Sequence, residues 1–371
     1  MLELKSMGLL AEGFRILNEG DHNLIPLDDD SHGRMDERFS SYQIVERNQD
    51  PPAPRTWIEH LPLFLKEDII QRHLGEWPMA QEVYSDIIVF KIEDHLREYT
   101  TQVGMAKLAH STGARAIFLD DGVEGEFRVR NLAPVAIRHQ GRIHSMDDLE
   151  ELDEETLARI LQTRTRLKEN GIQLTIDPAK AYYSLRLARE RQMTVQRAKD
   201  LMNLLGRPLD VIDPYCGVGP AVAQLVAQNG LVSRLHATDL NPDAIELLEL
   251  NLSNPSEEWY LGIADALTLT DQEELQSSFD LLLMNLPHDT LSHLPALLPL
   301  IRTDTPSMIR GWFVVEQEDI PYSERLFNDL LDSHGPLARR VTLEVRRQYN
   351  STKVLTRFEA LYGDWGADPS S

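Results

Sequence analysis

The chain has 371 residues, of which 42% are hydrophobic and 26% charged, and this composition is ordinary for a globular protein of two or three domains. Its single cysteine, Cys216, excludes an intrachain disulfide and a cysteine-rich metal site, and no run approaches the ~18 apolar residues needed to cross a bilayer. A net charge of −23 argues at first sight against a nucleic-acid partner. Because the first residues lack a signal-peptide pattern, we expect a cytoplasmic protein.

The first half of the chain predicts a small unit, a linker and an α+β domain. Residues 1–50 combine the helix-like "LKSMGLLAEGFRIL" with the strand-like "SYQIVER", and the proline-rich "NQDPPAPRTW" opens a linker assigned to residues 51–79. Strand-like and helix-like stretches then mix from residue 80 to 184, as in "YSDIIVFKI" and "EYTTQVGMAKLAHST". A charged insertion at about residues 145–165 interrupts this pattern, and it predicts an exposed helix.

Strands and helices alternate in residues 185–371. The strand-like "LDVID", "SRLHATD", "WYLGIAD", "FDLLLMN" and "MIRGWFVVEQ" are separated by helical or polar stretches, which predicts a mainly parallel sheet with helices on both faces. The last two strands, "RRVTLEVRRQY" and "VLTRFEALYG", have no helix between them and predict an antiparallel hairpin at the edge. Five parallel strands followed by a hairpin favour an α/β class I methyltransferase, a Rossmann-like fold, over a plain dinucleotide-binding fold.

Acidic residues end three of these strands. Asp213, Asp239 and Asp265 follow the first, second and third strands, and ligands of such sheets bind at the carboxyl ends of the strands. An acid after the second strand can accept both hydroxyl protons of a ribose. Gly217 and Gly219 allow the backbone to approach a ligand closely. A dinucleotide fits part of this pattern, but the turn reads "DPYCGVGP" rather than G-x-G-x-x-G, and an acid that can meet an adenine amino group favours S-adenosylmethionine.

The fourth strand ends in "NLPH", at residues 285–288. This element resembles the N-P-P-aromatic element of amino methyltransferases, in which a side-chain carbonyl and a rigid proline turn hold a planar nitrogen substrate. Asn285 and Pro287 are therefore candidates for holding a base.

Nearly the whole chain resembles one family, the archaeal and eukaryotic type of tRNA (guanine-N1)-methyltransferase, which methylates the guanine 3′ of the anticodon. "GVEGEFRVRNL" is similar to that family's G-E-F-R-x-R segment, and "IDPAKAYYSLRLARER" to its V-D-x-A-K-x-Y-F-S-P-R-L-x-x-E-R. "DPYCGVGP", "ATDLNP", "IAD" and "MNLP" follow in the family's order. The resemblance implies N-terminal α+β RNA-binding domains before the catalytic domain, with residues 1–50 touching the tRNA elbow.

The resemblance also implies a role for individual residues. Glu190 would take the N1 proton of guanosine-37 as general base, and Arg128 would stabilise the charge that grows on the neighbouring carbonyl oxygen. Asn285 and Pro287 would hold the base. The S-adenosylmethionine site would comprise Arg191, Asp213, Tyr215, Gly217, Gly219, Asp239, Leu240, Asp265, Ala266 and Asn285.

Basic clusters offer a way for an acidic protein to bind tRNA. They lie at residues 128–142, 186–199 and 339–357, and we expect them to converge around one groove. We expect a monomer, with no membrane contact and no metal ion. Two alternatives stay open, which are a wyosine-pathway aminocarboxypropyl transferase acting on the same tRNA position and a non-catalytic RNA-binding protein.

Overall fold

The computed structural model describes residues 4, 6–11, 16–19, 22–28, 31, 34–35, 39–46, 54–125, 127, 129–149, 152–253 and 255–366. Near the N-terminus, β1 (Leu17–Glu19) and β2 (His22–Leu24) form an antiparallel pair. Of the small unit expected over residues 1–50, 21 residues lie outside the described part of the chain. In the part of the chain that is described, no helix is long and apolar enough to span a membrane.

The segment expected to be a linker is helical from residue 57 onward. It forms the 3-10 helix η3 (Trp57–Leu63) and the helix α2 (Glu67–Arg72). Trp57, Leu61 and Ile70 are buried in one apolar cluster with residues of the following sheet. Burial of these side chains holds the two helices against the α+β unit, because apolar surface is removed from water there.

The α+β unit is built on a five-stranded sheet, in the order β3-β4-β5-β6-β7. Only β4 and β5 pair in parallel. The helix α3 packs closely on the sheet at Gly104, where an added Cβ would come 2.5 Å from Val135 Cγ1. The elements are β3 (Gln81–Tyr84), β4 (Ile87–Phe90), η4 (Asp94–Tyr99), α3 (Thr100–His110), β5 (Ala116–Glu124), β6 (Val129–His139) and β7 (Arg142–Ser145).

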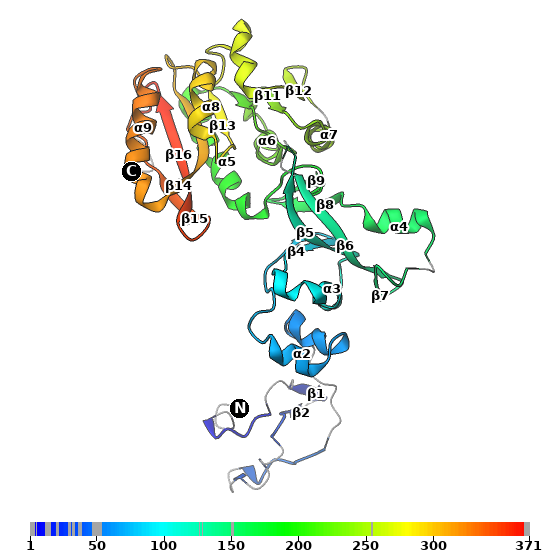
Figure 1. The fold of residues 1–371 in the computed structure, drawn as a ribbon. Helices are drawn as coiled ribbons and strands as arrows, with labels where there is room; N and C mark the ends of the chain where they lie inside the picture. The colour runs from blue at the N-terminus through cyan, green and yellow to red at the C-terminus, as the bar shows by residue number, and fades with distance from the viewer. Residues whose placement is uncertain are drawn as a thin grey trace.

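The insertion contains one helix, α4 (Glu154–Leu161), which projects away from the sheets (Figure 1). Asp153 begins it, since its carboxylate accepts a hydrogen bond from the Thr156 backbone N–H at 2.8 Å. A separate antiparallel hairpin follows, made of β8 (Thr165–Glu169) and β9 (Ile172–Ile176).

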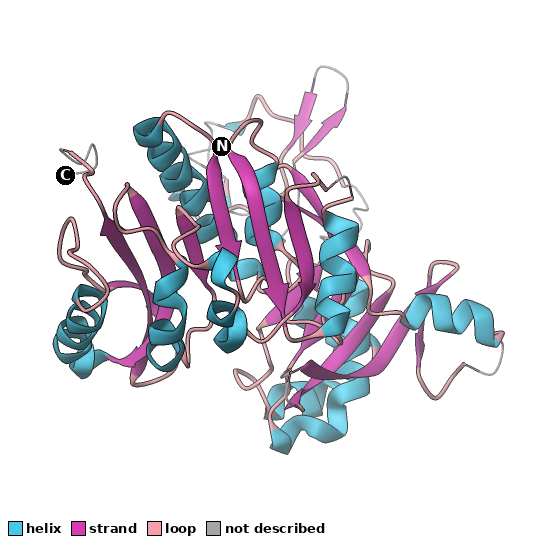
Figure 2. Cartoon of the chain, turned by 90° about the horizontal axis from the view of Figure 1, so that it is seen from above, coloured by secondary structure: helices cyan, strands magenta, loops and turns pink. Residues whose placement is uncertain are grey.

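The seven-stranded sheet confirms the predicted methyltransferase fold. Its order is β12-β11-β10-β13-β14-β16-β15, with parallel pairing from β12 to β14 and antiparallel pairing at β16 and β15. Figure 2 shows its strands between layers of helices. The strands are β10 (Leu209–Asp213), β11 (Val232–Asp239), β12 (Trp259–Ile263), β13 (Leu281–Met284), β14 (Ser307–Glu316), β15 (Glu344–Gln348) and β16 (Lys353–Tyr362).

Helices connect these strands and cover both faces, as the alternating sequence pattern predicts. The α-helices are α5 (Ala188–Leu205), α6 (Pro220–Val226), α7 (Pro242–Asn251), α8 (Thr290–Leu297) and α9 (Ile320–Asp332). Short 3-10 helices are η5 (Leu185–Leu187), η6 (Ala266–Asp271), η7 (Glu273–Leu275), η8 (Leu298–Leu300) and η9 (Gln317–Asp319).

Candidate functional site

A cavity of about 950 Å³ lies between the carboxyl ends of the parallel strands and the five-stranded sheet. We call it the central cavity. Its walls include the turn after β10, the ends of β11 and β13, and residues of β3, β4 and β6. Parallel strands of α/β sheets bind their ligands at this edge, so the position fits the sequence prediction.

Nine of the predicted site residues line the central cavity. They are Arg191, Tyr215, Gly217, Asp239, Leu240, Asp265, Ala266, Asn285 and Pro287. Three others, Asp213, Gly219 and Glu190, are not among its lining residues. Arg128 lies outside the described residues. Strand ends from distant parts of the sequence thus meet at one surface.

The glycine turn after β10 holds Asp239 in place. Gly217 has a φ of +54° and its backbone N–H donates to Asp239 Oδ2 at 2.8 Å. Asn241 N–H donates to Asp239 Oδ1 at 3.0 Å, so both carboxylate oxygens are fixed by the backbone. Gly219 packs against α7 instead, where an added Cβ would come 2.2 Å from Leu248 Cδ1. One glycine therefore shapes the cavity and the other permits the helix contact behind it.

Asp265 and Tyr215 frame the neighbouring part of the wall. Asp265 caps η6, because its carboxylate accepts from the Leu267 N–H at 2.9 Å. The Tyr215 hydroxyl lies 2.7 Å from His293 Nδ1, and burial raises the pKa of this tyrosine. Leu240 and Ala266 add apolar surface between the acids. The wall thus alternates hydrogen-bond acceptors with apolar patches, as recognition of a nucleoside requires.

Asp213 is fully enclosed behind the wall, and its nearest charged neighbour is Asp239. Burial, and then the charge of Asp239, raise the pKa of Asp213 to about 7. Burial also raises the pKa of Asp239. The two carboxylates give the site negative charge, and a cationic ligand would reduce the repulsion between them.

Replacing Asp213 by asparagine is expected to flatten the pH dependence of stability. Between pH 3.8 and about 7, Asp213 holds a proton in the folded state but has lost it in the unfolded state. The free energy of unfolding therefore falls as the pH rises through that window. Above it, Asp213→Asn should be more stable than the wild type by on the order of 2–4 kcal/mol. Urea denaturation at pH 5 and pH 8 checks this, with the exposed Glu249→Gln as control. An unchanged pH slope in Asp213→Asn would contradict it.

Arg191 is a buried cross-link as well as a wall residue. Its Nε donates to Glu169 Oε1 at 2.7 Å, and its Nη2 donates to the Ser184 carbonyl at 2.8 Å. The hydroxyl of Tyr183 and the amide of Gln224 also bond to the Glu169 carboxylate. This network ties β8 to α5 and α6, which places Arg191 firmly at the cavity wall.

Glu190 is buried and turned toward the terminal hairpin. Arg346 Nε donates to Glu190 Oε1 at 2.7 Å, and Arg346 Nη2 lies 2.6 Å from the same oxygen. The Arg357 Nη1 lies 3.5 Å from Glu190 Oε2. Leu187 and Arg191, which are close to Glu190 in the sequence, line the central cavity, whereas the Glu190 side chain does not.

Further cationic and aromatic residues line the wall, and some of them, such as Arg130, Tyr182 and Arg186, lie within the motifs that carry the family resemblance. Lys91, Arg130, Arg186 and Arg347 line the central cavity, so each of the three basic clusters contributes a residue to it. Others in the clusters are engaged elsewhere, since Arg138 donates to the Ala114 carbonyl at 3.1 Å. Besides Tyr215, the aromatic wall residues are Phe90, Phe127, Tyr182, Tyr183, Trp312 and Tyr349. Only chain folding brings these residues to one place.

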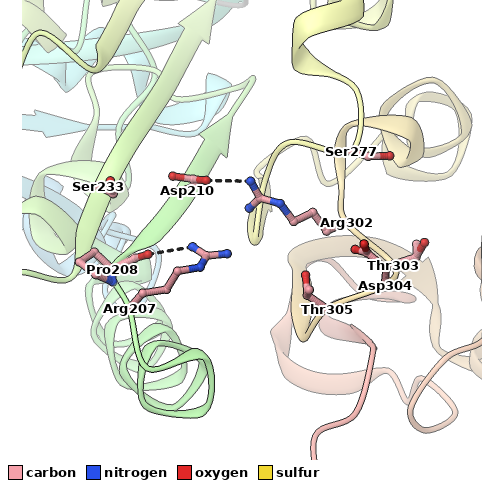
Figure 3. A pocket seen from close by; sticks show the side chains of 9 residues that line it. All are labelled: Arg207, Pro208, Asp210, Ser233, Ser277, Arg302, Thr303, Asp304 and Thr305. Atoms are coloured by element: carbon pink, nitrogen blue, oxygen red, sulfur yellow. Dashed lines mark hydrogen bonds and ion pairs between the residues drawn. The ribbon is translucent and has the colours of Figure 1, made fainter.

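A second cavity, of about 680 Å³, opens at the opposite ends of the strands (Figure 3). Its arginines are engaged with neighbouring groups. Arg302 Nη2 lies 2.8 Å from Asp210 Oδ2, and Arg207 Nη1 donates to the Pro208 carbonyl at 3.0 Å. These contacts stabilise the sheet edge, so this cavity is not the candidate site.

Comparisons with known proteins find relatives over most of the chain. The TRM5/TYW2 methyltransferase domain matches residues 165–326. The tRNA (guanine(37)-N(1))-methyltransferase Trm5b of Pyrococcus abyssi is 28% identical over 78% of this chain and 74% of its own length, and that of Methanocaldococcus jannaschii is 27% identical over 75% and 73%.

Solved structures share the fold over almost the whole chain. The crystal structure of Pyrococcus abyssi Trm5b has a TM-score of 0.66 at 21% identity, covering 98% of this chain and 95% of its own. A complex of aTrm5 with tRNALeu has a TM-score of 0.65 at 20% identity, covering 97% and 95%. Residues 165–326 thus match the TRM5/TYW2 methyltransferase domain, and most of the chain is similar to tRNA (guanine(37)-N(1))-methyltransferases.

Proposed function

We propose that this chain transfers a methyl group from S-adenosylmethionine to N1 of guanosine-37 in tRNA. The observation that carries the proposal is the meeting of Asp239, Asp265 and Asn285 in one cavity with cationic residues of the α+β unit. Relatives that span most of this chain are named for that activity. The cavity therefore joins a nucleoside-type site to a surface suited to a polyanion.

The fixed carboxylate of Asp239 suits the ribose of the cofactor. Its oxygens keep lone pairs beyond those used by Gly217 N and Asn241 N, and these can accept the two ribose hydroxyl protons. Asp265, at the next strand end, can accept from the adenine amino group, while Leu240 and Ala266 offer apolar contacts. S-Adenosylmethionine would supply a methyl group on a positively charged sulfur, and the acidic residues at the turn beside Asp213 suit that positive charge.

The opposite side of the cavity suits a guanine that has left the anticodon stack. Asn285 and Pro287, after β13, can hold the base edge, and Tyr182 is 56% exposed and available for stacking. Lys91, Arg186 and Arg347 can approach the phosphates on either side.

Catalysis requires removal of the N1 proton and support for charge on the carbonyl oxygen. We assign the first task to Glu190, which must turn from Arg346 toward the cavity when the base is bound. We assign the second to Arg128. Arg130 is its rival, because it lines the cavity and pairs with Glu82.

Mass spectrometry of tRNA nucleosides tests the function directly. The full chain is incubated with S-adenosylmethionine and two tRNA transcripts, one with guanosine and one with adenosine at position 37. Methylated guanosine only in the first supports the proposal. An aminocarboxypropyl product would identify the wyosine-pathway alternative instead, and an unmodified tRNA that still binds would identify a non-catalytic RNA-binding protein.

Asp239→Asn is expected to weaken S-adenosylmethionine binding by about 1.5–3 kcal/mol, because the amide cannot accept both hydroxyl protons and the two backbone N–H groups. Isothermal titration calorimetry measures the change. Asp243→Asn is the matched control, since that acid lies one turn along, pairs with Lys180 and does not line the cavity. Equal affinities of Asp239→Asn and wild type would refute the ribose assignment.

Three further expectations stay predictions. They are the tRNA elbow contact of residues 1–50, the monomeric state and the cytoplasmic location. The first is tested by deleting residues 1–50 and comparing activity on whole tRNA with activity on an anticodon stem-loop.

A further inference from the structure

Two histidines and a glutamate converge beside the outer rim of the central cavity. His73 ends α2, Glu76 lies in the turn that follows, and His95 belongs to η4. Glu76 Oε2 is 2.9 Å from His73 Nδ1 and 3.4 Å from His95 Nε2. One ligand atom from each residue lies within 4.8 Å of the other two. We call these three residues the His-Glu-His cluster.

The two separations that involve the Glu76 carboxylate are close to those of a tetrahedral zinc site. Zinc binds imidazole nitrogen and carboxylate oxygen at about 2.0–2.2 Å, so two ligand atoms of a tetrahedron lie roughly 3.3–3.5 Å apart. The observed separations of 2.9 and 3.4 Å require little movement to admit the ion. Three ligands from one carboxylate and two imidazoles are a common zinc donor set, with the fourth position left for water.

Aromatic side chains hold the first ligand in place. The His73 ring packs edge-on against Trp77 at 5.6 Å and lies 5.7 Å from the Tyr99 ring. Trp77 is buried, and its indole N–H donates to the Ile70 carbonyl at 3.2 Å. A fixed ring lowers the entropy cost of binding an ion, and neighbouring apolar surface strengthens the metal–ligand interaction. His73 is therefore packed in place, whereas the side chains of Glu76 and His95 are about half exposed and accessible to an ion.

We propose that His73, Glu76 and His95 bind a zinc ion. The ion would join α2 and the turn after it to η4, and so fasten the helices of residues 57–77 to the five-stranded sheet. Glu76 also lines the central cavity, so the site would add positive charge at its rim. The sequence predicted no metal site, since the chain has one cysteine and the two histidines are far apart along it.

Metal titration of the full-length protein, purified without a histidine tag and stripped with chelator, tests the proposal. Zinc chloride titrated into the wild type should show one equivalent bound in calorimetry, and cobalt(II) should give the visible absorption of a tetrahedral site. His95→Ala should weaken zinc binding by about 10–100-fold or more, because one of three protein ligands is lost. Zinc should raise the melting temperature of the wild type and not that of His95→Ala.

The control is His110→Ala, since His110 and His60 form another histidine pair with ring centroids 5.6 Å apart. Its zinc affinity should equal that of the wild type. The proposal is overturned if the wild type binds no equivalent of zinc, if His95→Ala binds it as tightly as the wild type, or if His110→Ala alone loses it. These readouts do not depend on methyl transfer, so they are independent of the proposed function.

Discussion

Glu190→Gln is expected to slow single-turnover methyl transfer by about 10²–10⁴-fold, because the amide keeps the shape of the side chain but cannot take a proton. Affinities for tRNA and cofactor should change little, since Glu190 is not among the residues lining the central cavity. Rapid-quench measurement of one turnover at saturating tRNA and cofactor gives the rate.

The matched control for this experiment is Glu344→Gln. Glu344 also pairs with Arg357 and Arg346, but it lies on β15 and its side chain is half exposed. The Glu344→Gln substitution thus removes a carboxylate partner of the same two arginines but leaves the proposed base in place. If Glu190→Gln and Glu344→Gln lower the rate equally, the effect comes from the arginines, and Glu190 is only their structural partner. A wild-type rate in Glu190→Gln would assign proton removal to another group.

Asp280→Ala is expected to lower the free energy of unfolding by about 3–5 kcal/mol, because it removes a buried carboxylate that pairs with two partly exposed guanidinium groups and accepts a backbone hydrogen bond. Asp280 is fully buried just before β13. Its carboxylate accepts from Arg207 at 2.7 and 2.8 Å, from Arg302 at 2.5 Å and from the Asp210 backbone N–H at 2.9 Å. Urea denaturation measures the loss.

Asp304→Ala is the control, since Asp304 is exposed and lines the second cavity together with Arg207 and Arg302, the arginines that pair with Asp280. It should change stability by less than about 0.5 kcal/mol. S-Adenosylmethionine affinity of folded Asp280→Ala should match the wild type, because the cofactor site lies at the other end of the strands. A loss below 1 kcal/mol, which is roughly the limit for a surface pair, would show that Asp280 is not the anchor of this network.

The catalytic fold could be predicted because its pattern is local. Asp213, Asp239 and Asp265 each end a short apolar run, and a parallel sheet necessarily brings such ends to one edge. Side-chain orientation could not be predicted. Glu190 faces Arg346 on a strand 156 residues further along, and no local pattern signals that pairing.

Other parts of the site depend on folding in a similar way. Lys91 and Arg347 meet at the central cavity although they come from different sheets. The prediction of a linker at residues 51–79 rested on its proline content rather than on the amphipathic stretch that follows the prolines. In the structure, the apolar residues Trp57 and Leu61 of that stretch pack against the next sheet. His73 and His95 lie on different helical segments, and their rings come within 6.3 Å of each other only in the folded chain.

The apolar core runs without interruption from the α+β unit into the catalytic sheet. One cluster contains Tyr84 and Phe118 of the first, Leu174 of the β8–β9 hairpin, and Val211 of the second. Tyr84 also stacks edge-on with Tyr183 at 6.2 Å. Sliding the two units apart would expose this shared core to water at a large cost in free energy. The walls of the central cavity thus belong to one packed body, and under the proposed function the nucleotide to be methylated leaves its stack to enter a cavity that is already formed.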